Sequence, residues 1–178
     1  DRRIFMTTWS SGSSGEYMIA VKKSSNLVVT VKKDSVAFNS TIIHGKELKD
    51  EGEAVEVNLQ VTQAKPGANV VLNNIYYNTN SADLKPESKI ILEGFAEYLK
   101  ENPSIRVEIQ GHTDNVGNPK DNDALSTNRA FSVKAMLEEL GVDGHRIEAK
   151  GYGSQRPVAD NHSEEGRAKN RRTEFMIL

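Results

Sequence analysis

Two residues of opposite charge stand at a spacing that could bind a zwitterion. Asp114 ends the run Gly-His-Thr-Asp at 111–114, and Arg129 follows fifteen residues later in Leu-Ser-Thr-Asn-Arg-Ala at 125–130. The surrounding pattern places the carboxylate just past a strand and the guanidinium in the first turns of a helix. A carboxylate accepts charge-assisted hydrogen bonds from an ammonium, and the planar guanidinium can hold a carboxylate with two of its own. The pair therefore suits a ligand that carries both an ammonium and a carboxylate.

The composition is that of a globular chain with one or two domains. It has 178 residues, of which 37% are hydrophobic and 27% are charged; these values leave room for a modest core in each domain. No apolar run approaches the roughly 20 residues of a membrane-spanning helix. The formal charge of −2 gives no general attraction to nucleic acid or anionic lipid. The sequence contains no cysteine, which excludes disulfides, thiolate metal sites and cysteine nucleophiles. The start at Asp1, without methionine or signal peptide, indicates a fragment or a processed form.

Residues 1–64 are predicted to form a small all-β, sandwich-like domain. Short segments at 16–21, 27–31, 36–43 and 54–61 are rich in β-branched and aromatic residues and partly alternate. The Ser/Gly run at 10–15 is typical of a loop or a flexible linker. No helical period occurs in this part of the chain.

Residues 65–178 are predicted to form an α+β domain that begins at Lys-Pro-Gly, 65–67. Strands are expected at 70–77, 105–109, 146–150 and 173–178. One helix is expected from Pro86 until Asn-Pro at 102–103, a second at 124–140, and a short one near 164–170. This βαβαβ(α)β order predicts two layers, with the helices packed on a mixed four-stranded sheet.

Residues 69–178 resemble the OmpA-like C-terminal domain, a peptidoglycan-binding module of Gram-negative envelope proteins. The order and spacing of several short motifs carry this resemblance. They are Tyr-Tyr-Asn-Thr-Asn-Ser-Ala-Asp-Leu at 76–84, Gly-His-Thr-Asp at 111–114, Gly117, Asn122, Leu125, Ser126, Arg129, Ala130, Gly-Tyr-Gly at 151–153, Pro157, Asn161, Gly166, Arg167 and Asn-Arg-Arg at 170–172.

The resemblance implies a binding site for the diaminopimelate of the peptidoglycan stem peptide. In that family the residues matching Asp114 and Arg129 hold the ligand, and Thr113, Asn122 and Leu125 are expected to line the pocket. Asn78 is a further candidate contact, although the family often has an aspartate there. The implied protein is no enzyme and needs no cofactor. It is expected in the periplasm, associated with the outer membrane, with envelope complex proteins as partners and membrane attachment only through upstream or partner anchors.

The N-terminal part resembles a carboxypeptidase-regulatory-like, transthyretin-type sandwich, on the strength of residues 15–21 and the later strands. This pairing of domains resembles modular envelope lipoproteins, including accessory proteins of the type IX secretion system. The resemblance implies that this chain is their wall-anchoring end.

Two other functions remain open from the sequence. A peptidoglycan hydrolase is disfavoured because the chain has no Ser-x-x-Lys, no His-Glu-x-x-His and no cysteine. The anchoring part of an ion-driven motor stator is disfavoured because a β-rich segment stands where such proteins carry a membrane helix. The four histidines show no metal-ligand spacing, so His112 is expected to be structural. Arg167 and Arg171 are expected mainly to tie the last helix to the sheet.

Overall fold

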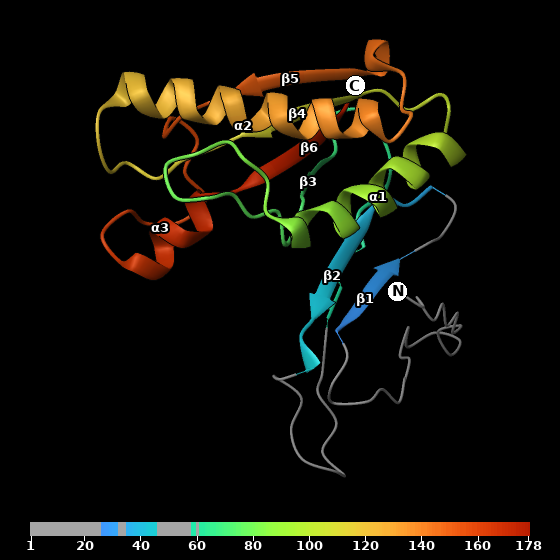
Figure 1. Cartoon of the computed structure of the whole chain (residues 1–178), viewed down its shortest axis with the longest axis horizontal. Helices are drawn as coiled ribbons and strands as arrows, with labels where there is room; N and C mark the ends of the chain where they lie inside the picture. The colour runs from blue at the N-terminus through green and yellow to red at the C-terminus, as the bar shows by residue number, and fades with distance from the viewer. Residues whose placement is uncertain (1–25, 32–34, 46–57, 60) are drawn as a thin grey trace. The chain divides into compact units, whose positions relative to one another are not determined.

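The structure is a computed structural model that describes residues 26–31, 35–45, 58–59 and 61–178 (Figure 1). The described residues between 28 and 42 and from 58 onward belong to one compact unit, and residues 26–27 and 43–45 belong to another. Strand β1 (Leu27–Val31) matches the predicted strand at 27–31, and β2 (Asn39–Ile43) is shorter than the predicted 36–43. The predicted strand at 16–21, most of the one at 54–61 and the loop at 10–15 lie outside the described residues. The sandwich-like N-terminal domain therefore stays a prediction.

The larger unit contains a mixed four-stranded sheet, as the sequence predicts. Its strands are β3 (Asn69–Val71), β4 (Val107–Gly111), β5 (Ile147–Gly151) and β6 (Thr173–Ile177). They lie in the order β3-β6-β4-β5, with β4 and β5 parallel and β6 antiparallel to both β3 and β4. Short 3-10 helix η2 (Gly144–Arg146) leads into β5. The predicted α+β class is thus confirmed.

Helix α1 (Pro86–Glu101) begins where the sequence predicts, with Pro86 in its first turn. A proline there loses no hydrogen bond, because the first N–H groups of a helix lack intrahelical acceptors. The helix ends at Asn102, whose side-chain amide donates to the carbonyl oxygen of Tyr98 at 2.8 Å. Its buried stripe recurs every three or four residues, as an amphipathic helix requires, and consists of Ser88, Ile91, Leu92, Phe95, Ala96 and Leu99.

Helix α2 (Pro119–Glu139) begins five residues before the predicted start at 124. The helix-start signal is Asn118 followed by Pro119. Asn118 Oδ1 accepts a hydrogen bond from the N–H of Lys120 at 2.9 Å, and Pro119 occupies the first turn. The extra turns matter for the site, because they include Asn122. The short helix α3 (Glu164–Asn170) lies where it is predicted.

The predicted strand at 70–77 is wrong in its second half. Strand β3 ends at Val71, and Asn74 has a positive φ of 62° that breaks the extended chain. Tyr77 instead forms an isolated antiparallel bridge with Leu84. The tyrosines and isoleucine of this stretch suggested a strand by propensity, but the two consecutive asparagines at 73–74 favour a turn.

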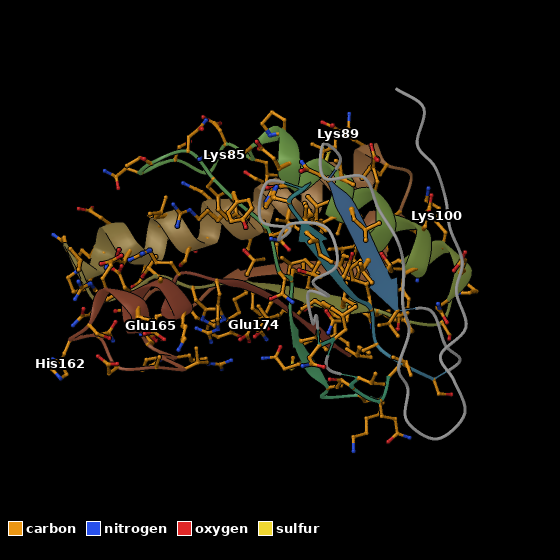
Figure 2. All side chains as sticks on the ribbon, turned by 90° about the horizontal axis from the view of Figure 1, so that it is seen from below. Lys85, Lys89, Lys100, His162, Glu165 and Glu174 are labelled. Atoms are coloured by element: carbon orange, nitrogen blue, oxygen red, sulfur yellow. The ribbon has the colours of Figure 1, made fainter. Side chains whose placement is uncertain are left out.

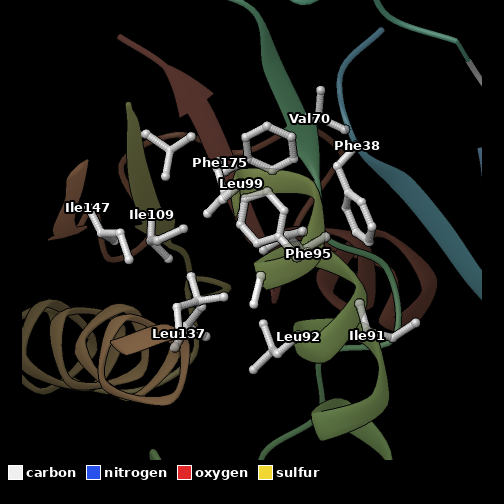
Figure 3. Packing of buried hydrophobic residues seen from close by; sticks show 14 of the residues in the cluster. Phe38, Val70, Ile91, Leu92, Phe95, Leu99, Ile109, Leu137, Ile147 and Phe175 are labelled. Atoms are coloured by element: carbon white, nitrogen blue, oxygen red, sulfur yellow. The ribbon is translucent and has the colours of Figure 1, made fainter. Parts of the chain in front are cut away.

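The core lies between the sheet and helices α1 and α2 (Figure 3). Phe95 of α1 lies at its centre, with its ring 4.6 Å from that of Phe175 on β6. Phe38, just before β2, covers the outer side of α1 with its ring 5.1 Å from that of Phe95. The contact joins the segment before β2 to the core of the α+β domain within the larger unit. A domain boundary near residue 65 stays a prediction.

Candidate functional site

A pocket of about 180 Å³ lies beside the loop that follows β4 and the N-terminal half of α2. Five of the six predicted site residues line it, namely Thr113, Asp114, Asn122, Leu125 and Arg129. The other lining residues are Asn80, Val116 and Arg171. Asn78 is exposed and does not line the pocket; Asn80, two residues on, does so in its place. A contact of Asn78 with a ligand therefore stays a prediction.

Two glycines let α2 approach the sheet closely enough to bring the two charges together. A Cβ on Gly111 would collide with the carbonyl oxygen of Ser126, and one on Gly151 would collide with the N–H of Thr127. Only glycine fits such contacts between a helix backbone and a sheet. Asp114 follows the first glycine by three residues and Arg129 follows Ser126 by three, so both line the same pocket.

The Asp114 carboxylate is held from two sides. Its Oδ1 accepts a hydrogen bond from the N–H of Val116 at 2.9 Å, and its Oδ2 accepts one from Arg171 Nη1 at 2.6 Å. The side-chain amide of Asn122 donates to the carbonyl oxygens of Asp114 and Val116, at 3.3 and 3.0 Å, which fixes the loop onto α2. Asp114 is 8% exposed, so the chain presents a nearly buried carboxylate in one defined orientation.

Arg129 is half-buried and only partly engaged. Its Nε donates to the carbonyl oxygen of Ser81 at 3.0 Å, and its guanidinium carbon lies 4.7 Å from the ring centre of Tyr77. Burial lowers the pKa of Arg129, the nearby Tyr77 raises it and Arg171 lowers it further, yet an arginine stays charged at any physiological pH. Among the described residues, its two Nη groups have no hydrogen-bond partner. They are therefore available to a carboxylate in the pocket.

Two further features belong to the pocket: a buried hydroxyl in its lining and a second hollow beside it. The hydroxyl of Thr113 is buried and finds no hydrogen-bond partner within the described part of the chain. A second hollow of about 390 Å³ adjoins the pocket, since Asn80, Val116, Asn122 and Leu125 line both. Its remaining lining residues are Gly117, Asn118 and Asp121, at the start of α2.

Arg171 is one of the pocket residues whose place there the sequence did not predict. Besides Asp114, it contacts Glu164, with Nη2 2.5 Å from Oε1. Hydrogen bonds to Asp114 and then to Glu164 raise its pKa. The Asn-Arg-Arg motif marked the position, but the contact with Asp114 joins residues 57 apart and depends on where α3 lies. Arg167 donates to the carbonyl oxygens of Asn161 and His162, so its hydrogen bonds tie α3 to the loop before it rather than to the sheet.

His112 lies away from the pocket lining, under a polar cluster on the sheet face opposite the helices. It is 2% exposed and stacks on Tyr152, with ring centres 5.5 Å apart. Burial, and then the charge of Arg172, lower its pKa to about 4, although Glu174 acts in the opposite direction. Neither ring nitrogen has a hydrogen-bond partner among the described residues, and these residues include no group of His, Asp and Glu that could hold a metal. A neutral, structural histidine agrees with these observations.

Two helices on one face of a mixed four-stranded sheet, with a charged pocket past β4 and beside α2, define an OmpA-like domain. The chain belongs to the OmpA family, whose model matches residues 76–171.

Relatives with the same domain carry envelope names. The chain is 40% identical over 120 residues to the probable lipoprotein YiaD of Escherichia coli K12, covering 66% of this chain and 55% of the relative. It is 43% identical over 103 residues to the peptidoglycan-binding protein ArfA of Mycobacterium bovis, covering 58% of this chain and 32% of that protein. The chain thus spans about half the length of YiaD and a third of ArfA.

Solved structures agree on the fold. The peptidoglycan-associated lipoprotein of Burkholderia pseudomallei matches with a TM-score of 0.55 and 35% identity, over 58% of this chain and 88% of that one. The periplasmic domain of Helicobacter pylori MotB matches with a TM-score of 0.54 and 26% identity, over 61% of this chain and 73% of that one. In the part of this chain that the structure describes, no helix is long and apolar enough to cross a membrane.

Proposed function

We propose that this chain binds peptidoglycan without catalysis and anchors an envelope protein to the cell wall. One observation carries the proposal: Asp114, in the loop after β4, and Arg129, on α2, line the same pocket. Family membership and the names of the peptidoglycan-binding protein ArfA and the Burkholderia peptidoglycan-associated lipoprotein support peptidoglycan as the ligand.

The proposed ligand is the free end of diaminopimelate in the stem peptide. This end carries an ammonium and a carboxylate on one carbon. The ammonium donates to Asp114, and the carboxylate accepts from the two Nη groups of Arg129. N–H groups at the start of α2 add a favourable field for the carboxylate. The walls of the pocket are formed by Thr113, Asn122 and Leu125. Binding of the ligand needs no cofactor.

For the whole protein we propose a periplasmic location associated with the outer membrane. The names of the relatives, a lipoprotein and outer-membrane proteins, support this location. Envelope complex proteins are the proposed partners, and attachment to the membrane would come from upstream segments or from those partners. A role beside the type IX secretion system remains a hypothesis from the sequence resemblance alone.

The wall-anchoring part of an ion-driven motor stator is a second candidate. The similarity to the periplasmic domain of MotB supports it. Both functions use the same pocket, so ligand binding does not separate them. Any sequence that precedes Asp1 would separate the two functions. A membrane helix close upstream would favour a stator, and a run of further repeat domains would favour a modular lipoprotein.

Calorimetry with a diaminopimelate-containing stem peptide tests the site. We expect Asp114→Asn and Arg129→Gln each to lose about 2–5 kcal/mol of binding free energy, because each removes one partner of a desolvated charged contact. This equals a loss of roughly 30-fold or more in affinity. Arg129→Lys should also weaken binding, since an ammonium cannot hold a carboxylate with two parallel hydrogen bonds.

Arg106→Ala is the matched control, because Arg106 is an exposed arginine that does not line the pocket. Wild-type affinity in both Asp114→Asn and Arg129→Gln would refute the site. The absence of catalysis is tested separately by incubating purified sacculi with the protein. Soluble muropeptides whose release a single substitution abolishes would show a hydrolase instead.

A further inference from the structure

We propose that Arg171 is a positioning residue of this site, which holds the Asp114 carboxylate in the orientation that receives the ligand's ammonium. The inference rests on the proposed function. It assigns a binding role to an arginine whose sequence context indicated mainly a structural one.

The geometry around Asp114 fixes both carboxylate oxygens. Arg171 Nη1 lies 2.6 Å from Oδ2, and the N–H of Val116 lies 2.9 Å from Oδ1. With one donor on each oxygen, the carboxylate cannot rotate without losing a hydrogen bond. A group held in its bound orientation before the ligand arrives loses less entropy on binding.

The two donors leave room for a ligand. An ionised carboxylate offers about four lone-pair sites, two on each oxygen. Val116 uses one site on Oδ1 and Arg171 uses one on Oδ2, and Asp114 still lines the pocket. The ammonium therefore uses the remaining sites and does not have to displace Arg171.

Arg171 is itself held by α3. Its Nη2 contacts Glu164 at the start of that helix, at 2.5 Å, so one guanidinium bridges two carboxylates. Glu164 also pairs with Arg167, at 2.9 Å. The negative charge of Glu164 offsets the positive charge that Arg171 brings near the pocket, which would otherwise repel an ammonium.

Arg167 provides a matched control for the stability of α3. It is an arginine of α3 that shares Glu164 with Arg171, the residue directly after that helix, but it neither contacts Asp114 nor lines the pocket. Arg167→Gln loosens α3 without removing a donor from Asp114. A role that is only structural would give the two substitutions similar effects on binding.

The test is a double-mutant cycle with the stem peptide, read by calorimetry and by melting curves. We expect Arg171→Gln to weaken binding about tenfold, or about 1.4 kcal/mol, and Arg167→Gln to change it less than twofold. In an Asp114→Asn background, Arg171→Gln should cost nothing more, because its effect passes through the carboxylate. The amide resonance of Val116 should shift in Arg171→Gln and stay in place in Arg167→Gln.

Four results would overturn the inference. They are wild-type or tighter binding by Arg171→Gln, equal losses in Arg171→Gln and Arg167→Gln, a further loss in the Asp114→Asn background, and an unmoved Val116 resonance. If Arg171→Gln does not fold, Arg171→Lys takes its place, with an expected loss of about threefold because one ammonium cannot bridge Asp114 and Glu164. Wild-type affinity of Asp114→Asn and Arg129→Gln would instead refute the proposed function.

Discussion

The two faces of strand β4 are almost equally buried but have opposite chemistry. Ile109 faces the helices and is fully buried in hydrocarbon. Gln110, the next residue, faces away from them and is 2% exposed, yet it lies among polar groups and donates to Glu108 at 2.7 Å. The same face carries His112 and Glu174, and Figure 2 shows Glu174 on the side of the sheet away from α2.

The difference shows that buried side chains are stabilised in two ways. On one face they are stabilised by filling volume, and on the other face by pairing charges. On the helix face the side chains fill space, and a lost methyl group leaves a cavity. On the polar face, which lies opposite the helices, Glu174 Oε1 accepts a hydrogen bond from Arg172 Nε at 2.5 Å. The side chains of Glu174 and Arg172 are 6% and 8% exposed. We therefore expect the loss of stability caused by substitutions on the helix face to be insensitive to pH. The loss caused by substitutions on the polar face should depend on protonation.

Phe95→Ala should have the largest effect on stability. Phe95 is fully buried and packs against the rings of Phe38 and Phe175. Its truncation to alanine therefore leaves a large cavity. We expect a loss of about 4 kcal/mol in the free energy of unfolding, measured with denaturant. Ile90→Ala, on the solvent side of the same helix, is the control and should cost much less. A loss below about 1 kcal/mol in Phe95→Ala would contradict the packing.

Glu174→Gln should be next, with a loss of about 3 kcal/mol. The substitution keeps the shape but leaves the charge of Arg172 buried without its partner. It also weakens the acceptor for the side-chain amide of Asn69. Glu148→Gln, an exposed glutamate of β5 on the same face, is the control. Equal stability of the two variants would show that the buried pair contributes nothing.

The third prediction concerns pH. Burial lowers the pKa of His112 to about 4 from its usual 6.5, so between these values the unfolded chain binds a proton that the folded chain does not. Stability should therefore fall as the pH falls from about 6.5 to 4. The full shift corresponds to about 3 kcal/mol, and relaxation of the fold around a charged ring should reduce it to about 2.

His112→Phe is the variant that tests this dependence. A phenyl ring can keep the stacking on Tyr152, and the histidine nitrogens have no hydrogen-bond partner among the described residues to lose. Denaturant titrations at several pH values should show a flatter profile between pH 6.5 and 4 than in the wild type. An unchanged slope would assign the pH dependence to other groups.

Arg106→Ala should have the smallest effect, about 0.5 kcal/mol or less. Its partner is Glu148, at 3.2 Å, but both side chains are more than half exposed. Water and salt screen such a pair, and holding two long side chains in place costs entropy. A change in the melting temperature as large as that of Glu174→Gln would show that exposure does not separate the two kinds of pair.

The sequence predicted those parts of the fold that depend on local patterns. Pro86 and the apolar stripe after it predict α1, and the alternation of apolar and polar residues around Ile109 predicts β4. The hydrophobic pattern places the start of α2 too late, because the helix begins at the Asn118 cap, and it makes the strand at 70–77 too long, because Asn74 turns the chain. These errors come from turn and cap chemistry rather than from the hydrophobic pattern.

The candidate site was predicted through motif spacing, which places Asp114 and Arg129 in one pocket. The lining by Asn80 and Arg171 was not predicted. Asn80 has a positive φ of 51°, and its place depends on the path of the whole loop. Arg171 reaches Asp114 only because α3 folds back beside the loop after β4. Such contacts arise from tertiary arrangement, which a single sequence does not show.

The position of β6 has a consequence for the order of folding. This strand is the last of the four along the chain, yet it lies between β3 and β4 and pairs with both. During synthesis, β3 has no partner in the sheet until residues 173–177 have been made, and Phe175 is missing from the core until then. The helices and the β4–β5 pair can form earlier, but the domain closes in a late, cooperative step. A ribosome stalled before β6 should therefore hold a chain that proteases cut readily.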